Sequence, residues 1–210
     1  MKPLVTFSEQ DFNVFTIPGL DERMDAIKTY VRPKLETLGA HLAPVLSELV
    51  GHEMYPHVAK HARRTVNPPD DTWVAWAYDK RGYKKHPHFQ VGLWQTHLFV
   101  WFALIYESPF KADFANRALP EVSTIMKTIP SHFVWSLDHT KPEAIKHTSL
   151  TEQELTTILE RLEKVKKAEL LCGIHVDRDD PLLLDGVQLE EKIIATFKQL
   201  VPLYRLAQPR

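Results

Sequence analysis

The chain has 210 residues, of which 44% are hydrophobic, 10% aromatic and 25% charged. These proportions exclude a disordered chain, a collagen and a long coiled coil. The formal net charge of −1 excludes a uniformly basic nucleic-acid-binding protein, and the single cysteine excludes an intramolecular disulfide. We therefore expect one soluble, cytoplasmic domain that spans residues 1–210.

No segment is predicted to cross a membrane or to direct secretion. The N-terminal residues contain no long apolar region of the kind found in signal peptides. The longest apolar run, residues 98–106, is much shorter than the roughly 20 residues that a membrane-spanning helix needs. We expect this run to form a buried strand.

The first part of the chain is predicted to be helical. Hydrophobic residues recur every three or four positions from Leu20 to Leu49, which is the period of one helix face. Proline removes a backbone donor and clashes with the preceding turn. We therefore expect Pro33, Gly39 and Pro44 to divide this stretch into two or three helices that share one buried face.

The centre of the chain is predicted to form a β-sheet. Residues 72–78 are rich in residues that favour strands, and residues 88–94 alternate apolar with polar or small side chains. Residues 79–82 predict a turn in which Gly82 adopts a positive φ. These patterns together predict a hairpin. Residues 98–106 are apolar on both faces and predict a third, central strand.

Further elements follow towards the C-terminus. We expect short helices over residues 109–119 and 120–129 and strands over residues 133–137 and 170–176. Thr151 to Glu154 form a capping box that predicts the start of a helix. A last helix is expected to begin near Asp185 and to end before Pro202. Helices at both ends of a β-rich centre predict an α+β domain with helices packed on an antiparallel sheet.

The segment from His57 to His88 is the most informative for function. It contains seven basic and three acidic residues, an excess of four positive charges, and five of the eleven histidines lie in or beside it. Arginine binds phosphate or carboxylate with two parallel hydrogen bonds, and histidine adds pH-sensitive donors. A solvated basic surface is the alternative interpretation. The predicted anion-binding residues are His57, Lys60, His61, Arg63, Arg64, Arg81, Lys84, Lys85, His86 and His88.

The histidine spacing permits a metal site but does not favour one. His57 and His61 stand four residues apart and His86 and His88 two apart, so each pair shares one face of a helix or strand. The surrounding cations oppose the binding of a dication, and no C-x-x-C or H-E-x-x-H motif is present. We therefore expect no metal and no cofactor.

Single-stranded nucleic acid is a second class of ligand for the same segment. Arg81-Gly82-Tyr83 begins like the RNP1 signature of RNA-binding domains, but the next residues break the match. Aromatic side chains between basic ones are suited to stacking on unpaired bases, although core packing is the alternative for most of them. Trp76 and Tyr78 are expected on one strand face and Trp73 on the other. The aromatic residues concerned are Trp73, Trp76, Tyr78, Tyr83 and Trp94.

Other candidate residues are scattered. Glu107, Asp138-His139 and the acidic segment from Asp177 stand at the ends of predicted strands, where acids usually cap loops. His175 and Cys172 lie in an apolar strand, so we expect a hydrogen-bonded histidine and an inert thiol in the core. The chain contains no P-loop, no G-x-S-x-G and no G-x-G-x-x-G motif. Whether it catalyses a reaction stays open.

Several motifs resemble one family. Residues 57–69, HVAKHARRTVNPP, and residues 80–89, KRGYKKHPHF, are similar to the YktB-like family of uncharacterised bacterial proteins, as are Asp11-Phe12 with Phe15 and Asp138-His139. The resemblance implies a two-layer α+β sandwich with an antiparallel or mixed sheet, and a cytoplasmic location. It implies no activity and no catalytic residues.

Three hypotheses for function follow. The first is binding of a small phosphorylated or carboxylate ligand through the basic segment. The second is a nucleic-acid-associated module that uses the same residues with exposed aromatics. The third is a partner-binding or oligomeric protein without catalysis, although the sequence does not indicate an oligomeric state. The first two hypotheses require residues 57–64 and 80–88 to meet in space.

Overall fold

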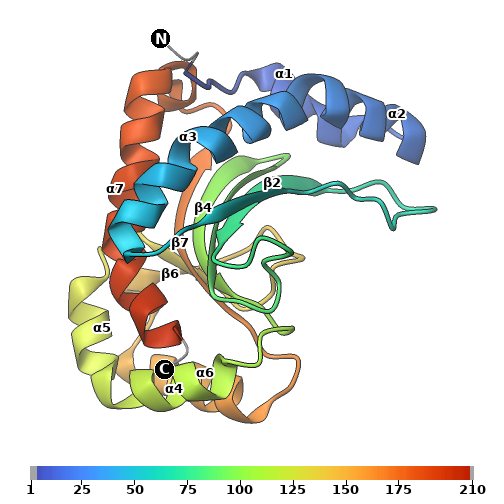
Figure 1. The fold of residues 1–210 in the computed structure, drawn as a ribbon. Helices are drawn as coiled ribbons and strands as arrows, with labels where there is room; N and C mark the ends of the chain where they lie inside the picture. Colours follow the sequence, from blue (N-terminus) through green and yellow to red (C-terminus); the bar gives the residue numbers. More distant parts are fainter. Residues whose placement is uncertain (1–3, 209–210) are drawn as a thin grey trace.

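An antiparallel sheet forms the centre of the computed structural model, which describes residues 4–208 (Figure 1). Its seven strands have the order β1-β2-β3-β4-β7-β5-β6. All neighbouring strands are antiparallel, and β7 inserts between β4 and β5. The strands are β1 (Tyr55–Val58), β2 (Asp71–Ala77), β3 (His88–Trp94), β4 (His97–Leu104), β5 (Val134–Ser136), β6 (Ile145–Lys146) and β7 (Leu170–Asp177).

The helices cover one face and one end of this sheet. Helices α3 and α7 lie side by side across the same face, whereas α4, α5 and α6 gather at the end where α7 finishes (Figure 1). The loop between β1 and β2, residues 59–70, projects beyond the sheet. The α-helices are α1 (Glu9–Asn13), α2 (Leu20–Ala26), α3 (Arg32–Val50), α4 (Lys111–Ala118), α5 (Val122–Thr128), α6 (Glu152–Lys164) and α7 (Gly186–Ala207).

The main core lies between the sheet and the helices. Because side chains alternate along a strand, Trp76, Phe89 and Phe102 all point towards α3 and α7 and are fully buried. The Trp76 indole donates a hydrogen bond to the Gly39 carbonyl of α3 at 3.0 Å. The Phe89 ring lies 4.9 Å from that of Tyr204 in α7, measured between centroids. The face of the sheet that carries these aromatic side chains is thereby shielded from solvent by α3 and α7.

Most of the predicted elements are confirmed. Strands β2 and β3 form the expected hairpin, and β4 is a central strand buried on both faces. Thr151 caps α6 through the predicted capping box with Glu154. The α+β class and the antiparallel sheet with helices on one face also agree with the expectation. Within residues 4–208, no helix combines the length and apolar character needed to cross a bilayer.

Three predicted helix breaks were wrong. Helix α3 continues through Gly39 and Pro44, and α7 continues through Pro202 to Ala207. Both prolines lie on exposed helix faces, where water can satisfy the carbonyl that each proline leaves unpaired. Gly39 serves close packing instead, because a Cβ there would lie 3.1 Å from side-chain atoms of Pro56 and Val74.

The predicted positive φ of Gly82 was also wrong. The glycines with positive φ in residues 4–208 are Gly19 and Gly51. The Asp79 side chain accepts a hydrogen bond from the Arg81 amide at 2.8 Å, and the Asp79 carbonyl accepts one from the Gly82 amide at 3.3 Å. Asp79 therefore closes the turn without a left-handed residue.

Candidate functional site

The face of the sheet opposite α3 and α7 carries polar and aromatic side chains. We call it the open face. Strand alternation places Trp73 of β2, Gln90 of β3 and Trp101 of β4 on this face. A second, smaller hydrophobic cluster forms there around Trp94 and Phe99. The aromatic rings leave room for a few buried polar groups between them, which is the usual composition of a ligand pocket.

A narrow pocket opens on this face. Its free space is about 10 Å³, roughly the room that one water molecule needs. Only one small group of a ligand can enter without movement of the side chains around it. We call it the open-face pocket, and its lining residues are Asp71, Trp73, Gln90, Trp94, Phe99, Trp101, Ser136, His139, Lys141 and Leu171.

Asp71 is the buried acid of the pocket. Its residue surface is 9% exposed, and within residues 4–208 no other residue donates a hydrogen bond to its carboxylate. Burial raises the pKa of Asp71 to about 7, although the positive charges of His139 and Arg64 oppose this shift. The carboxyl is therefore divided between its neutral and ionised forms at neutral pH.

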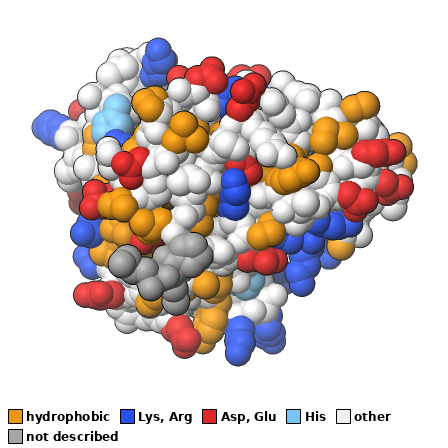
Figure 2. All heavy atoms as spheres, turned by 90° about the horizontal axis from the view of Figure 1, so that it is seen from above, with side chains coloured by type: hydrophobic (Ala, Val, Ile, Leu, Met, Phe, Trp, Pro, Cys, Tyr) orange, Lys and Arg blue, Asp and Glu red, His pale blue; other side chains and the backbone are white. Residues whose placement is uncertain are grey.

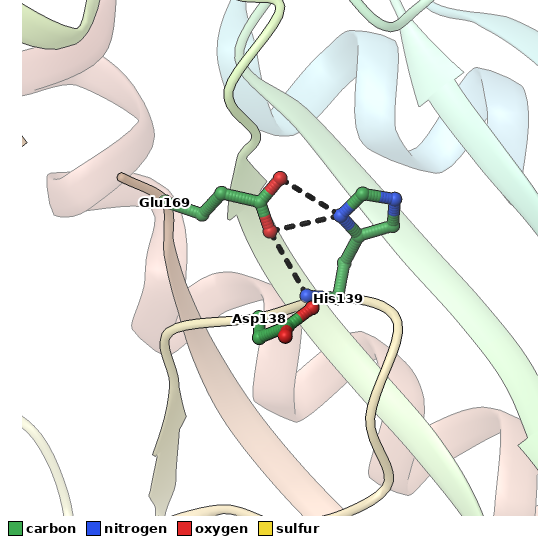
Figure 3. Close-up of side chains that lie close together, drawn as sticks. All are labelled: Asp138, His139 and Glu169. Atoms are coloured by element: carbon green, nitrogen blue, oxygen red, sulfur yellow. Dashed lines mark hydrogen bonds and ion pairs between the residues drawn. The ribbon is translucent and has the colours of Figure 1, made fainter. Parts of the chain in front are cut away.

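His139 is a half-buried histidine of the pocket, and Glu169 orients it. The imidazole Nδ1 lies 2.8 Å from both carboxylate oxygens of Glu169 (Figure 3). Burial alone would lower the pKa of His139, but the hydrogen bond and charge of Glu169, together with Asp71 and Glu107, raise it overall. The hydrogen bonds from His139 likewise lower the pKa of Glu169 against the effect of burial. The pair is thus stabilised as imidazolium and carboxylate.

Asp138, His139 and Glu169 are close enough to be tested as a metal centre. The Glu169 oxygens already accept hydrogen bonds from the His139 amide at 2.9 Å and the Tyr106 amide at 3.1 Å, besides the imidazole. The Asp138 carboxylate accepts two from Thr140, at 2.6 and 3.0 Å. A metal would have to displace the Nδ1 proton and most of these donors, so the arrangement fits an oriented imidazole and does not fit a metal centre.

The two predicted binding segments meet beside the pocket. His57 Nε2 lies 2.9 Å from the Asp79 carbonyl, and the His57 ring lies 5.9 Å from that of Tyr83. His61 packs edge-on against Trp73, whose indole donates to the Tyr83 hydroxyl at 3.0 Å. Residues 57–64 and 80–88 therefore contact each other through Trp73 and Tyr83, as the first two hypotheses require.

Several of the predicted anion-binding side chains already have partners. Arg81 and His86 both approach the Asp79 carboxylate, at 3.5 and 3.3 Å. Lys84 donates to Glu107 at 3.2 Å. Arg64 donates to two carbonyls of its own loop, at residues 67 and 68. The remaining basic side chains, Lys60, Arg63 and Lys85, are exposed.

His88 lies beneath this surface. It is fully buried, its Nδ1–H donates to the His86 carbonyl at 2.7 Å, and its Nε2 accepts from the Gln90 amide at 2.9 Å. Burial lowers the pKa of His88 to about 3. The neutral imidazole therefore holds the Gln90 side chain in place behind the pocket wall.

The helical side of the molecule has no comparable grouping in the view of Figure 2. Acidic and basic side chains are interspersed there with scattered hydrophobic ones, seen from the side of α2 and α3 (Figure 2). Such mixing is typical of an ordinary solvated surface. Of these two surfaces, the open face, which holds buried ionisable groups, is the better candidate for function.

Known proteins match this chain over almost its whole length. Residues 7–204 match a family described as a domain of unknown function, DUF1054. A UPF0637 protein of Bacillus velezensis is 55% identical over 202 residues, which cover 96% of each chain. A UPF0637 protein of Bacillus cytotoxicus is 50% identical over 203 residues, 97% of this chain and 98% of its own. The chain belongs to the DUF1054 family.

Membership of DUF1054 confirms the expected resemblance to uncharacterised YktB-like proteins. The matched region contains every residue of the open-face pocket. Because the family is described as one of unknown function, the comparisons assign no ligand or reaction, and the function has to be argued from the geometry of the site.

Sequence reasoning missed three residues of this DUF1054 site. Neither Asp71 nor Glu169 was singled out as a site residue from the sequence, and Gln90 was placed only within a predicted strand. The available signal was alternation, because Gln90 stands between the core residues Phe89 and Val91. A buried polar residue on the second face of a buried strand indicates a second environment on that face.

His175 and Cys172 illustrate the same alternation. Cys172 points to the main core, where burial raises its pKa, as expected of an inert thiol. The core position expected for His175 was wrong: it is half-buried on the open face and stacks on His97, with 3.7 Å between ring centroids. Cys172 and His175 stand three positions apart along β7, and an odd separation places two side chains on opposite faces of a sheet.

Proposed function

We propose that this protein binds a small anionic ligand at the mouth of the open-face pocket, with one polar group of the ligand inserted into it. The observation that carries the proposal is the approach of cationic side chains from two loops to a pocket with an aromatic wall. Loop 59–70 supplies Arg64, whose charge acts on Asp71, and the loop after β5 supplies the lining residues His139 and Lys141. Carboxylate and phosphate are the groups that such donors bind best.

The charges around the pocket support an anion. Glu169 and the other nearby acids raise the pKa of His139, so the imidazole carries positive charge over a wider pH range than a free histidine. Lys141 lines the pocket, and its only acidic partner among the described residues is Asp138, at 3.6 Å. That lysine side chain is 67% exposed, so an incoming anion can compete for it.

The aromatic wall supports a small ligand of which one end is desolvated. Trp94 and Trp101 are buried, and Trp73 is half-buried between the pocket and loop 59–70. Apolar rings exclude water and strengthen each charged hydrogen bond made beside them. The small free volume favours a ligand that inserts a single carboxyl, carbonyl or hydroxyl group.

Nucleic acid receives less support from the aromatic residues. Trp76 is fully buried under α3, Tyr78 packs against the main core and Trp94 is 8% exposed. Of the aromatic residues considered for stacking, this leaves Trp73, Tyr78 and Tyr83 partly accessible. A single-strand-binding surface usually offers several stacking rings along a groove. A small ligand is therefore the better interpretation.

The test is a thermal-shift and calorimetric titration with inorganic phosphate, glycerol 3-phosphate, acetate and pyruvate. A ligand at 100 times its dissociation constant stabilises the fold by about 2.7 kcal/mol. We expect at least one of these anions to bind, with an affinity that falls at least tenfold in Lys141→Ala and in Arg64→Ala. The control is Lys198→Ala, an exposed lysine of α7. Absence of saturable binding, or equal loss in Lys198→Ala, would contradict the proposal.

A further inference from the structure

We propose that the open-face pocket is an acid–base catalytic site, in which His139 and Asp71 move protons on a small anionic carbonyl compound. The inference rests on the proposed anion binding and adds a reaction to it, in which Lys141 and Arg64 attract the anionic group and His139 acts in its neutral form. In this account His139 and Asp71 are catalytic residues. Glu169 is a positioning residue that acts through His139.

The His139 ring is held in one orientation by Glu169. Its Nδ1 faces the Glu169 carboxylate at 2.8 Å, so this nitrogen carries the hydrogen and donates it (Figure 3). In the neutral ring the lone pair is then on Nε2, which points away from Glu169 (Figure 3). Within residues 4–208, Nε2 makes no hydrogen bond, and it is not sealed from solvent. A fixed tautomer with an open Nε2 is the form of a general base.

Asp71 is the second catalytic residue. It lines the same pocket as His139 and is surrounded by Trp73, Trp94 and Phe99. The carboxyl of Asp71 receives no hydrogen bond from another described residue, and its oxygens are not among the side-chain atoms sealed from solvent, so they are free to meet a ligand. A carboxyl that keeps its proton in apolar surroundings can donate that proton to an oxygen on which negative charge develops.

The reaction step requires only these two groups. His139 Nε2 removes a proton from the carbon next to the carbonyl, and the C–H electron pair becomes the C=C bond. The carbonyl π pair takes the proton of the Asp71 carboxyl, so the product is an enol. His139 is left as imidazolium and Asp71 as carboxylate, and the reverse step restores both. No oxidant or other co-reactant is consumed.

Among its described lining residues, the pocket offers no hydroxyl or thiol nucleophile that would favour a covalent mechanism, and the Lys141 amine is exposed and lies 3.6 Å from Asp138. Ser136 is the hydroxyl residue among its lining residues, and it donates to the Asp138 carbonyl at 3.1 Å. Cys172 lies on the other face of the sheet and is fully buried. A base opposed to an acid, without an activated nucleophile, is suited to proton transfer.

The pH dependence follows from the groups that face the pair. His139 faces Glu169, Asp71, Glu107, Asp138 and Lys141, and Asp71 faces His139, Arg64 and Asp70. The reaction needs neutral His139 and protonated Asp71, so the rate is lost both at low and at high pH. Glu169→Gln removes a charge that raises the pKa of His139. We therefore expect this variant to shift the limb of the rate profile that His139 sets to lower pH.

The experiment is hydrogen–deuterium exchange at carbon, followed by proton NMR in D₂O near neutral pD. The probes are pyruvate, 2-oxobutyrate and dihydroxyacetone phosphate, each with the full chain and without it. We expect the protein to accelerate loss of the C–H signal next to the carbonyl for at least one probe. His139→Gln and Asp71→Asn should each lower this rate about 100-fold or more.

A matched control separates chemistry from folding. His41 of α3 lies 3.6 Å from Glu190 and is outside the pocket, so His41→Gln should leave exchange unchanged. If a probe binds but none exchanges, or if His139→Gln exchanges as fast as the native chain, the catalytic inference is wrong while the binding proposal stands. If no probe binds in the titration, both fail. If His139→Gln does not fold, the pH profile of Glu169→Gln decides, and a profile in which neither limb moves to lower pH overturns the inference.

Discussion

His139 Nδ1 lies 2.8 Å from both carboxylate oxygens of Glu169, and this contact joins the loop after β5 to the start of β7. The Glu169 side chain is 4% exposed and that of His139 21% exposed. The same carboxylate also accepts from the Tyr106 backbone, next to the end of β4. One buried acid thus fixes three segments around the open-face pocket, and it determines which imidazole nitrogen faces the ligand.

Glu169→Gln should therefore destabilise the fold in a pH-dependent way. The raised pKa of His139 gives stability that is present below the ordinary histidine pKa of 6.5 and is lost as pH rises through the folded value. Because the pKa of Glu169 is lowered from its ordinary value of 4.5, its contribution to stability is fully present above pH 4.5 and is lost as pH falls through the folded value. We expect a loss of about 2 kcal/mol at pH 5.5 and a smaller loss at pH 8.5, measured by urea unfolding. Equal losses at the two pH values would contradict the ion pair.

Asp71→Asn should stabilise the fold at alkaline pH. The Asp71 pKa is raised from 3.8 to about 7, so the folded chain holds a proton that the unfolded chain has released between these values. Stability therefore falls as pH rises from 4 to 7 and then levels off. We expect the asparagine variant to lack this fall and to be more stable at pH 8 by about 1–3 kcal/mol.

The control for this prediction is Asp70→Asn. Asp70 is the neighbouring acid, but its side chain is 76% exposed and contacts Arg23 at 3.0 Å. The Asp70→Asn variant should show the same fall in the free energy of unfolding between pH 4 and 7 as the native chain. A native-like slope in Asp71→Asn would show that Asp71 does not hold the proton.

His97 and His175 should make the fold sensitive to acid. Burial lowers the pKa of His97 to about 4 and that of His175 to about 3, and their rings are stacked 3.7 Å apart. Their contribution is present above pH 6.5 and is lost as pH falls towards these values. His175→Phe retains a stacked ring without a charge. We expect the difference in melting temperature between the variant and the native chain to favour the variant more at pH 4.5 than at pH 7. The same difference at both pH values would show that protonation of the pair does not destabilise the fold.

Gly39→Ala should destabilise the chain although alanine favours helices. A Cβ at this position would lie 3.1 Å from atoms of Pro56 and Val74, in strands that α3 presses against. Overpacking typically costs about 1–3 kcal/mol, whereas alanine gains about 1 kcal/mol over glycine in a helix. We expect a net loss of about 1 kcal/mol in urea unfolding. A gain in stability would show that the contact between α3 and the sheet relaxes freely.

The fold was predictable where local patterns and tertiary structure agree. The hairpin of β2 and β3 and the capping box of α6 depend on residues close in sequence. The predicted breaks at Gly39 and Pro202 failed because packing and exposure decide whether a helix tolerates them. The order in which β7 inserts between β4 and β5 carries no local signal.

The candidate site was predictable only in part. The local composition predicts the cluster of cations around His57 and Tyr83. Residues 57–64 and 80–88, which supply it, contact each other in the structure. The pairing of His139 with Glu169 joins residues 30 positions apart through the order of the strands. The burial that raises the Asp71 pKa depends on Trp73 and Trp94, and no motif records such an environment.

The most direct test of the central claim is an NMR titration of the histidine side chains, with ¹⁵N-labelled full chain and pyruvate or inorganic phosphate as the ligand. The account predicts an Nδ1–H tautomer for His139 and a saturable shift of its Nε2 signal, with that of His41 unchanged. Saturable binding that leaves His139 unmoved, or binding that shifts His41 instead, would contradict the assignment of function to the open-face pocket.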